Sequence, residues 1–449
     1  MTKVGISQVA WATMAAAALL ATGEPARAQR WDRGGGLGGL VSAETGSKLK
    51  IGAEFRSRYE SRTGMGFGRE TDVDAVYLRT RLSLSYTPVS WIRFSGMLQD
   101  SRAPLYGYNA PATARDTADL HEGFVELYPE RKTGFGLQAG RAMLNYGEGR
   151  LIGTPQWGNL SRSYDHARMY YRTGRARVEL LFVSPVKVRI GEFNQPVLGD
   201  HIWGAYNVFP NLVGRSLVEA YFLRRDQNRP GGFTGGSRAA GTDKLGVNTF
   251  GFRMAGPLAR GIQYSAEGAL QNGTVGPASH RGGAWVSGVT RRWTAFGKPL
   301  DVGLEYKFAS GTRNPADTSR VGTFDQLYAA FHDRFGHQDL FGWRNIHSVR
   351  SLAVLGVNKR LAFNLMYDSF WLASARDALY NGSGKAIVRS ATGTAGRHVG
   401  QEPDVFATYK YGRFTVGAGF GYFLIGTFIS NTTPGVNPVY VYVFQAYSL

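Results

Sequence analysis

Residues 76–99 read VYLRTRLSLSYTPVSWIRFSGMLQ and decide the fold. Apolar side chains occupy alternate positions on both sides of a short interruption at 87–90. The polar positions between them carry Arg79, Arg81 and Arg93, together with serines and a glutamine. A period of two with charge on one face predicts a strand that has one apolar and one polar face. Two such runs joined by a short turn predict an antiparallel hairpin.

The same alternation recurs from Lys48 to the end of the sequence. Further runs lie at 48–60, 177–182, 262–271, 301–308, 361–368, 413–424 and 439–449. Short connections are expected at 87–90, 129–133, 173–175, 211–214, 255–260, 295–299, 356–359 and 411–413. Long connections are expected at 61–72, 102–118, 143–166, 185–201, 225–246, 273–282, 311–344, 373–400 and 427–438. This order predicts an all-β protein, a transmembrane up-and-down antiparallel β-barrel of about 18 strands with short periplasmic turns and long extracellular loops.

The composition agrees with a barrel. The chain has 449 residues, of which 60 are glycine, 13% are aromatic and none is cysteine. Glycine suits tight turns, and aromatic residues suit the girdles where a barrel meets the lipid interface. No later segment offers the ~18 consecutive apolar residues of a membrane helix, and only helices and closed barrels span lipid. The alternative is a soluble periplasmic protein, which at this length requires two or more domains.

Residues 1–28 have the features of a secretory signal peptide. Lys3 supplies positive charge, residues 9–21 form an apolar segment, and Ala26-Arg27-Ala28 fits a cleavage site. Cleavage near Ala28 removes one net positive charge, so the full-length value of +19 becomes +18. We expect residues 29–47 to be a flexible glycine-rich lead and residues 48–449 to form a barrel in the Gram-negative outer membrane.

Residues 140–169 stand out because glycine, arginine and aromatic residues alternate there without strand or helix periodicity. Repeated glycine and a proline exclude a helix. We interpret this segment as a long loop that folds back over another part of the protein and presents guanidinium groups to it. The alternative is an ordinary surface loop with turn glycines.

Arginine on the polar faces of the strands is the main functional signal. Arginine stays charged and binds carboxylates in a bidentate fork, so an arginine-lined interior would attract an anionic solute. The candidate solute-binding cations of the lumen and loops are Arg56, Arg79, Arg81, Arg93, Arg141, Arg150, Arg162, Arg168 and Arg344.

Two points qualify this interpretation. By strict alternation Arg141 faces lipid, so we expect either a bulge or a position above the bilayer there. The arginines could also be neutralised within a structural network of interior charges. The candidate acidic partners for that alternative are Glu54, Glu60, Glu122, Glu126 and Glu179.

Three stretches resemble the alginate-export family of outer-membrane barrels. The first is Gly140-Arg141, Leu144, Tyr146-Gly147, Arg150-Leu151-Ile152-Gly153, Trp157 and Arg162-Ser163-Tyr164-Asp165. The second is Phe324-Asp325-Gln326-Leu327-Tyr328, His332, Gly336, Asp339-Leu340 and Gly342-Trp343-Arg344-Asn345. The third is Leu379-Tyr380-Asn381-Gly382-Ser383-Gly384, Gly400-Gln401-Glu402 and Asp404. The resemblance, which covers residues 48–449, implies an exporter of an acidic, uronate-containing polysaccharide.

Other classes of function have weaker support. The run His332-Asp333, His337 and Asp339 imitates a metal site, but its spacing matches no structural zinc pattern, so we expect ordinary loop histidines, no metal and no other cofactor. Basic residues are spread along strands and do not form a nucleic-acid-binding patch. The sequence has no G-x-S-x-G motif, and we do not expect the protein to be an enzyme.

The sequence therefore predicts an outer-membrane channel that passes an anionic saccharide or carboxylate, with export of an alginate-like polymer as the first hypothesis. The alternatives are a general or carboxylate-selective uptake porin and a non-conducting surface binding protein. Expected partners are the solute, outer-membrane lipid and lipopolysaccharide, and a periplasmic export machinery is a further candidate.

Overall fold

The computed structural model describes residues 43–44, 48–68, 72–109, 113–128, 132–228, 244–390 and 392–449. The predicted signal peptide (1–28), most of the predicted lead (29–47) and most of the predicted loop 225–246 lie outside the described residues.

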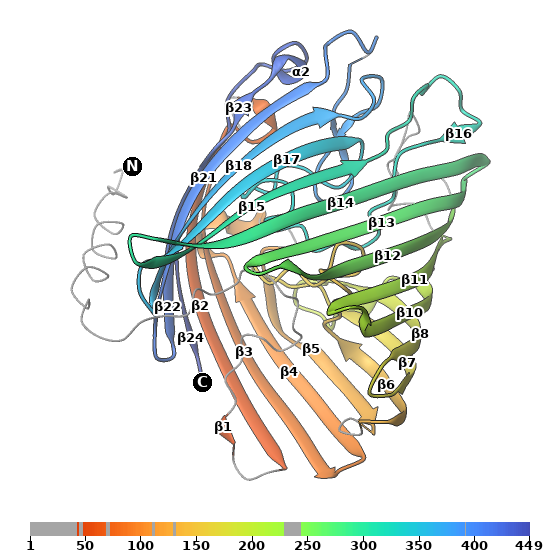
Figure 1. The fold of residues 1–449 in the computed structure, drawn as a ribbon, viewed down its shortest axis with the longest axis vertical. Coiled ribbons are helices and arrows are strands. Elements are labelled where there is room, and N and C mark those ends of the chain that lie inside the picture. The colour runs from red at the N-terminus through yellow and green to blue at the C-terminus, as the bar shows by residue number, and fades with distance from the viewer. Residues whose placement is uncertain are drawn as a thin grey trace.

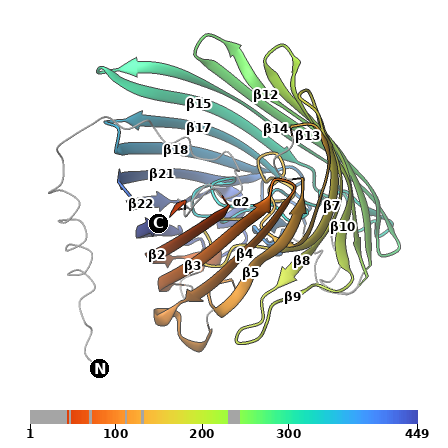
Figure 2. The same ribbon diagram turned by 90° about the horizontal axis from the view of Figure 1, so that it is seen from below.

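Within this part of the chain, eighteen long strands form one closed antiparallel barrel. They are β2 (Leu49–Thr63), β3 (Val73–Val89), β4 (Ile92–Arg102), β5 (Asp116–Leu127), β6 (Gly134–Ala142), β7 (Tyr164–Arg172), β8 (Arg177–Lys187), β10 (Asp200–Val213), β11 (Ser216–Gln227), β12 (Leu245–Ala259), β13 (Ile262–Val275), β14 (Ala278–Ala295), β15 (Lys298–Ala309), β17 (Ile346–Gly356), β18 (Leu361–Leu372), β21 (His398–Tyr411), β22 (Phe414–Tyr422) and β24 (Val439–Ser448). Figures 1 and 2 show these strands curving round into one barrel. The ring closes because β2 pairs with β24, from Glu54 opposite Ser448 to Thr63 opposite Val439. The predicted fold class and strand number are confirmed.

Short elements lie before the first barrel strand and in the connections between strands. They are β1 (Ala43–Glu44), which pairs with β2, β9 (Gln195–Pro196), β16 (Arg320–Val321), β19 (Leu379–Tyr380), β20 (Ala386–Val388), β23 (Leu424–Ile425), the helical turn α2 (Thr427–Ser430) and the 3-10 turns η1 (Met65–Phe67) and η2 (Pro104–Asn109). Among the described residues, no helix has the length and apolar character needed to cross a membrane.

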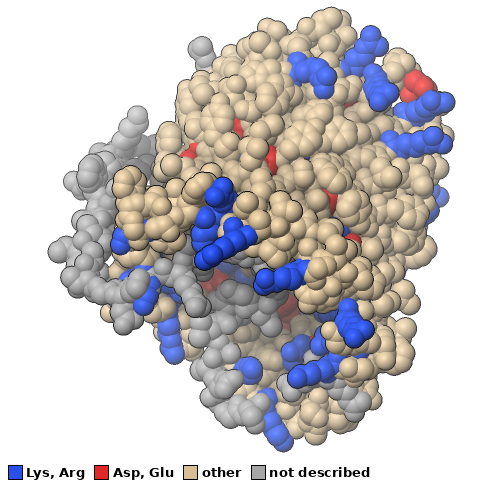
Figure 3. Space-filling model, in the orientation of Figure 1, with Lys and Arg blue, Asp and Glu red and all other residues tan. Residues whose placement is uncertain are grey.

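Side chains of the strands separate by parity as predicted. In β3, Leu82 and Leu84 are 56% and 48% exposed, whereas Arg79 and Arg81 are each 3% exposed. The apolar positions therefore form the outer surface, and the guanidinium groups point into the barrel. Figure 3 shows the result on one face of the molecule, where wide areas carry no charged side chain.

The prediction of a long loop at residues 273–282 is wrong. Residues 273–282 contain glycine and proline, which favoured a long connection, but β13 and β14 are joined by Gly276 and Pro277 alone. Val275 still pairs with Ala278, so the ladder continues to the turn. Gly276 has a φ of 55°, the left-handed conformation that a two-residue hairpin requires at its first position.

Part of the interior is apolar, which the alternation did not predict. Inner-face residues of β8 and β10, such as Val183 and Ile202, pack in one buried cluster with loop residues that include Ile152, Phe341 and Trp343. These loop side chains need an apolar partner, and strands that are apolar on both faces supply it. The connections on the long-loop side therefore do not only surround the mouth; some of them enter the barrel.

Substitution of a lipid-facing residue tests the assignment of faces. Leu82→Arg places a charge near the centre of β3, and we expect it to destabilise folding into phospholipid vesicles by about 2–4 kcal/mol, as measured by reversible guanidinium unfolding. Phe296→Arg is the matched control because Phe296 is 98% exposed in the turn between β14 and β15, where the cost falls to about 0–1 kcal/mol. Equal costs at both positions would contradict the assignment.

Candidate functional site

The connection between β6 and β7, residues 143–163, enters the barrel and is called loop A. It lies against the inner face of β2, where Arg56 binds three consecutive backbone carbonyls of the loop. Arg56 donates from Nη1 to the carbonyl of Gln156 (2.9 Å) and from Nη2 to those of Trp157 (3.0 Å) and Gly158 (2.8 Å). The prediction that this segment folds back into the protein is confirmed.

Three more wall arginines bind the same part of loop A. Arg79 donates to the first and third of these carbonyls at 2.9 and 3.0 Å, and Arg58 donates to the middle one. Arg81 donates to the Gln156 side chain at 2.8 Å. Glu54 balances part of the charge, because its carboxylate lies 2.6 Å from Nη2 of Arg79.

These contacts reverse part of the sequence interpretation. The sequence predicts that the loop presents guanidinium groups, but at 156–158 the strands of the barrel wall present them and the loop supplies the carbonyl acceptors. Arg56, Arg79 and Arg81 are buried, with exposures of 3–6%. Buried charges require partners, and hydrogen bonds from a charged donor are about twice as strong as neutral ones. These arginines therefore hold loop A in place.

Loop A also carries arginines of its own. Arg150 lies 3.0 Å from Glu267 of β13, 3.3 Å from Glu305 of β15 and 2.9 Å from Glu148 of the loop itself. Burial opposes ionisation of Glu148, but the charges of Arg150 and two other arginines outweigh it and hold the pKa of this carboxyl below its usual range. Loop A is thus attached to opposite sides of the barrel by charge.

A second inward connection, residues 310–345 between β15 and β17, is called loop B. Backbone hydrogen bonds join it to loop A, including Tyr328 N–H to the Leu151 carbonyl at 2.8 Å. Arg162 of loop A donates to the Tyr328 carbonyl at 2.7 Å. The two loops therefore form one unit inside the barrel.

Arg344 lies in loop B and is also paired. Its Nη2 donates to Oδ1 of Asp325 at 2.8 Å, and Nη1 of Arg225 from β11 lies 3.1 Å from Oδ2 of the same carboxylate. Burial disfavours the charged form of Asp325, yet the two guanidinium groups keep the pKa of its carboxyl below the usual range. Arg344 thus stabilises loop B.

A different group of arginines lies below loop A, near the short turns, and is called the turn-side arginines: Arg93 on β4, Arg168 and Arg172 on β7, and Arg177 on β8. The side chains of Arg93, Arg168 and Arg177 are 32%, 18% and 26% exposed. Arg93 pairs with Glu126, and both Arg168 and Arg177 pair with Glu179. Four guanidinium groups face two carboxylates, so positive charge is in excess here.

Tyr170 lies at the centre of the turn-side arginines. Its hydroxyl donates to Glu126 at 2.9 Å, and the guanidinium groups of Arg177 and Arg172 lie 4.3 and 5.3 Å from its ring centroid. Arg177 was not among the predicted site residues, although its parity with Glu179 in the polar positions of β8 was a usable signal.

Arg141 is not in the lumen. It shares the outer face of β6 with the exposed Phe135 and Leu137, and its Nε and Nη2 bind the two oxygens of Asp165 at 2.7 and 3.0 Å. The register of β6 with β7 runs without a bulge. Arg141 lies next to Ala142, the last residue of β6 on the loop side, so the strand end and not a bulge accommodates the charge.

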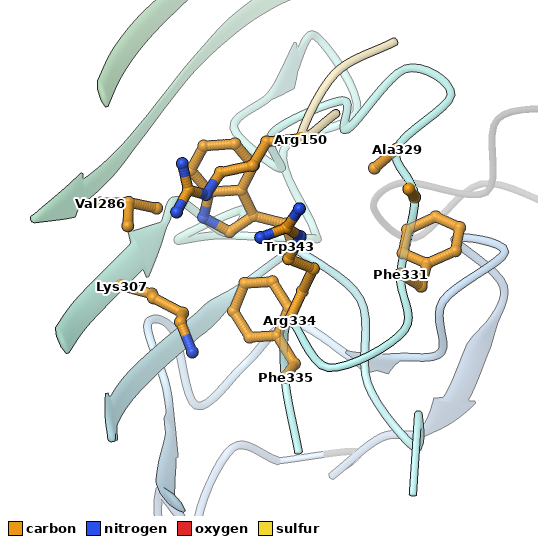
Figure 4. Close-up of a pocket in the computed structure, with 9 residues that line it drawn as sticks. Arg150, Val286, Lys307, Ala329, Phe331, Arg334, Phe335 and Trp343 are labelled. Atoms are coloured by element: carbon orange, nitrogen blue, oxygen red, sulfur yellow. The ribbon is translucent and has the colours of Figure 1, made fainter. Parts of the chain in front are cut away.

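Figure 4 shows a small cavity between loop A, loop B and the wall. It is lined by Arg150, Val286, Lys307, Ala329, Ala330, Phe331, Arg334, Phe335 and Trp343. Its cations already have acidic neighbours, since Lys307 lies 2.8 Å from Glu305 and Arg150 contacts Glu267. The cavity belongs to the packing between the loops and the wall.

Comparison with known proteins agrees with this architecture. A family model described as "Alginate export" matches residues 47–442. The chain belongs to the alginate export family. No curated protein matches this family member in sequence.

Solved structures share the fold of this alginate export family member at low sequence identity. OccD3 (OpdP) of Pseudomonas aeruginosa is 13% identical with a TM-score of 0.60, and the match covers 95% of each chain. OccK3 (OpdO) of the same organism is 14% identical with a TM-score of 0.59, covering 92% of this chain and 98% of the other. OccK2 (OpdF), solved in complex with glucuronate, is 11% identical with a TM-score of 0.57, covering 89% of this chain and 98% of the other. Together, the family and the barrel make the protein an outer-membrane channel.

Removal of the wall arginines tests their role in holding loop A. The double variant Arg56→Ala/Arg79→Ala removes five hydrogen bonds to loop carbonyls, and each charged hydrogen bond contributes about 1.5–3 kcal/mol. We expect loop A to become mobile, with larger and noisier single-channel conductance than in the wild type. Arg141→Ala on the outer face is the control. Unchanged conductance in a correctly folded double variant would contradict the assignment.

Proposed function

We propose that the barrel conducts anionic solutes and that its solute carries uronate-type carboxylates. The observation that carries this proposal is the excess of partly exposed guanidinium groups around Tyr170 on the inner faces of β4, β7 and β8. A confined positive wall concentrates anions and lowers their entry barrier. Arginine forks match carboxylate geometry.

The wall arginines Arg56, Arg79 and Arg81 have a different role in this proposal. Loop A occupies their donors, so they shape the constriction and contribute field without binding the solute directly. The solute contacts instead fall to Arg93, Arg168, Arg172 and Arg177, of which Arg93 and Arg168 are among the candidate solute-binding cations named above. The family supports an alginate-like polymer as the solute, and the glucuronate in the OccK2 structure supports a uronate monomer.

Uptake or release of short carboxylates is the second candidate function. The observation in its favour is the apolar packing of loops A and B inside the barrel, where Ile152, Phe341 and Trp343 are buried. A polymer requires more room than a monosaccharide, so these loops would have to move for export. Block of the ionic current by uronate oligomers of increasing length distinguishes the two candidates, because only a polymer channel admits the long chains.

Charge removal on the turn side tests anion conduction. The triple variant Arg93→Gln/Arg168→Gln/Arg177→Gln keeps side-chain bulk but leaves Glu126 and Glu179 without their counter-charges. We expect the anion-to-cation permeability ratio, measured from reversal potentials in a salt gradient, to fall several-fold. Arg141→Gln is the matched control, because it removes the same charge from the outer face.

Two outcomes would refute the proposal. The first is a wild-type channel that prefers cations, or a wild-type protein that does not conduct; absence of conduction would favour a non-conducting surface binding protein. The second is a triple variant that folds and conducts with wild-type selectivity.

We further propose that residues 1–28 are a signal peptide and that the mature chain starts at Gln29. N-terminal sequencing of the protein extracted from outer membranes should begin at Gln29. Recovery of a chain that begins at Met1 would show that this segment is retained.

A further inference from the structure

Loop B carries a cluster of metal-type donors where it packs against loop A, β21 and β24. His332, Asp333 and His337 each offer one ligand atom, and these three atoms all lie within 4.8 Å of one another. Their spacing in the sequence fits no known structural zinc pattern and predicts ordinary loop histidines. The fold of loop B brings the donor atoms of these three residues close together, which their spacing in the sequence does not indicate.

Neighbouring groups orient both imidazole rings. Nδ1 of His332 lies 2.8 Å from Oδ2 of Asp339, and Nε2 of His337 lies 2.9 Å from the hydroxyl of Tyr442 on β24. A carboxylate or hydroxyl on one ring nitrogen determines which nitrogen is left for a metal, as in many zinc sites. Here the remaining atoms are Nε2 of His332 and Nδ1 of His337.

The two remaining ring nitrogens differ in whether they have a hydrogen-bond partner. Nδ1 of His337 lies 2.5 Å from Oδ1 of Asp333. Nε2 of His332 is buried and has no hydrogen-bond partner among the described residues. A buried ring nitrogen without a partner is costly, and coordination of a cation would satisfy it.

Stacking holds the rings in place. His332 stacks on Trp157 of loop A with a centroid distance of 4.7 Å and an interplanar angle of 7°. His337 stacks on Phe406 of β21 at 4.4 Å and 3°. Rings held in this way lose little freedom when they bind a ligand. The side chains of His332 and Asp333 retain 11% and 19% exposure, so one edge of the cluster reaches solvent although Nε2 of His332 is buried.

We propose that His332, Asp333 and His337 bind one divalent transition-metal cation of the Zn²⁺ type between loops A and B. Two imidazoles and one carboxylate are a common three-residue zinc set, with water in the fourth position. Bonds of about 2.0–2.2 Å in a tetrahedral site put donors roughly 3.3–3.6 Å apart. Nδ1 of His337 and Oδ1 of Asp333 are closer than this, at 2.5 Å, whereas the three ligand atoms together span up to 4.8 Å. Binding therefore requires the Asp333 carboxylate to turn away from His337 and towards His332.

The charges around the cluster favour a borderline metal over a hard cation. Asp333 and Asp339 supply negative charge, but Arg58 lies over Trp157 at 4.2 Å and Arg350 donates to the Asp333 carbonyl. A hard ion such as Ca²⁺ needs six or more oxygen ligands, whereas Zn²⁺ binds imidazole nitrogen well enough to tolerate nearby positive charge. The bound cation would also tie loop B to loop A through the stacked Trp157.

Titration of the purified barrel tests the proposal. The full-length mature protein, without a histidine tag, is freed of metal with a chelator in detergent micelles and titrated with Zn²⁺ by calorimetry. Co²⁺ is the second probe, because its visible absorption reports nitrogen ligands and coordination number. We expect one saturable site per chain, at least about tenfold weaker in His332→Gln, His337→Gln and Asp333→Asn, with Asp339→Asn weakened about 10–100-fold through lost orientation of His332.

His166→Gln is the matched control. His166 also faces the lumen and has an amide partner, Gln138 at 2.9 Å, but it lies outside the cluster; its affinity for Zn²⁺ should equal that of the wild type. Correct folding of each variant is checked by heat-modifiable migration in gels. Absence of saturable Zn²⁺ binding, or binding that survives in the folded His332→Gln/His337→Gln double variant, would overturn the proposal and leave a simple ion pair between His332 and Asp339.

Discussion

The structure depends on one constraint: inside lipid, a backbone N–H or C=O group has no water to bond, so each must find a partner in the protein. A sheet satisfies this only if its two edge strands meet, and here β2 and β24 pair over ten residues of register. Once the ring is closed, successive side chains of each strand have only two environments, lipid and lumen. Leu82 and Arg81 are chain neighbours, yet they differ from 56% to 3% exposure for this reason.

The closed ring creates a second problem inside. Arg56 and Arg79 lie directly opposite each other on β2 and β3, and like charges in such a pair repel. Glu54 offsets only part of this charge. Loop A solves the problem with backbone dipoles, because its carbonyls at 156–158 accept hydrogen bonds from both arginines. The same contacts position the loop, so charge in the wall determines the shape of the lumen.

This arrangement separates two kinds of interior arginine. The arginines that contact loop A are buried, and their N–H groups already donate hydrogen bonds to the loop. They therefore act on a solute only through their electrostatic field. Those near the turns have the carboxylates of Glu126 and Glu179 as partners but retain exposed surface. The sequence is compatible with two roles for these arginines, solute binding and a structural network. The structure contains residues that suit each role, at different heights in one barrel.

The sequence by itself determined the fold class, the strand number and which side of a strand faces lipid. It could do so because an alternation with a period of two is a local property, and in a closed barrel alternate residues face either the lipid or the lumen. It also placed Arg79 and Arg168 in the lumen, but the inclusion of Arg141 among the lumen and loop cations was wrong, because Arg141 lies on the outer face of β6. Only the tertiary structure decided which arginines donate hydrogen bonds to loop A and that residues 273–282 contain a tight hairpin. It also decided that the donor atoms of His332, Asp333 and His337 lie close together. These features depend on the path that a loop takes after its strand ends. The contacts that loops A and B make with strands far away in the sequence leave no periodic pattern in the sequence.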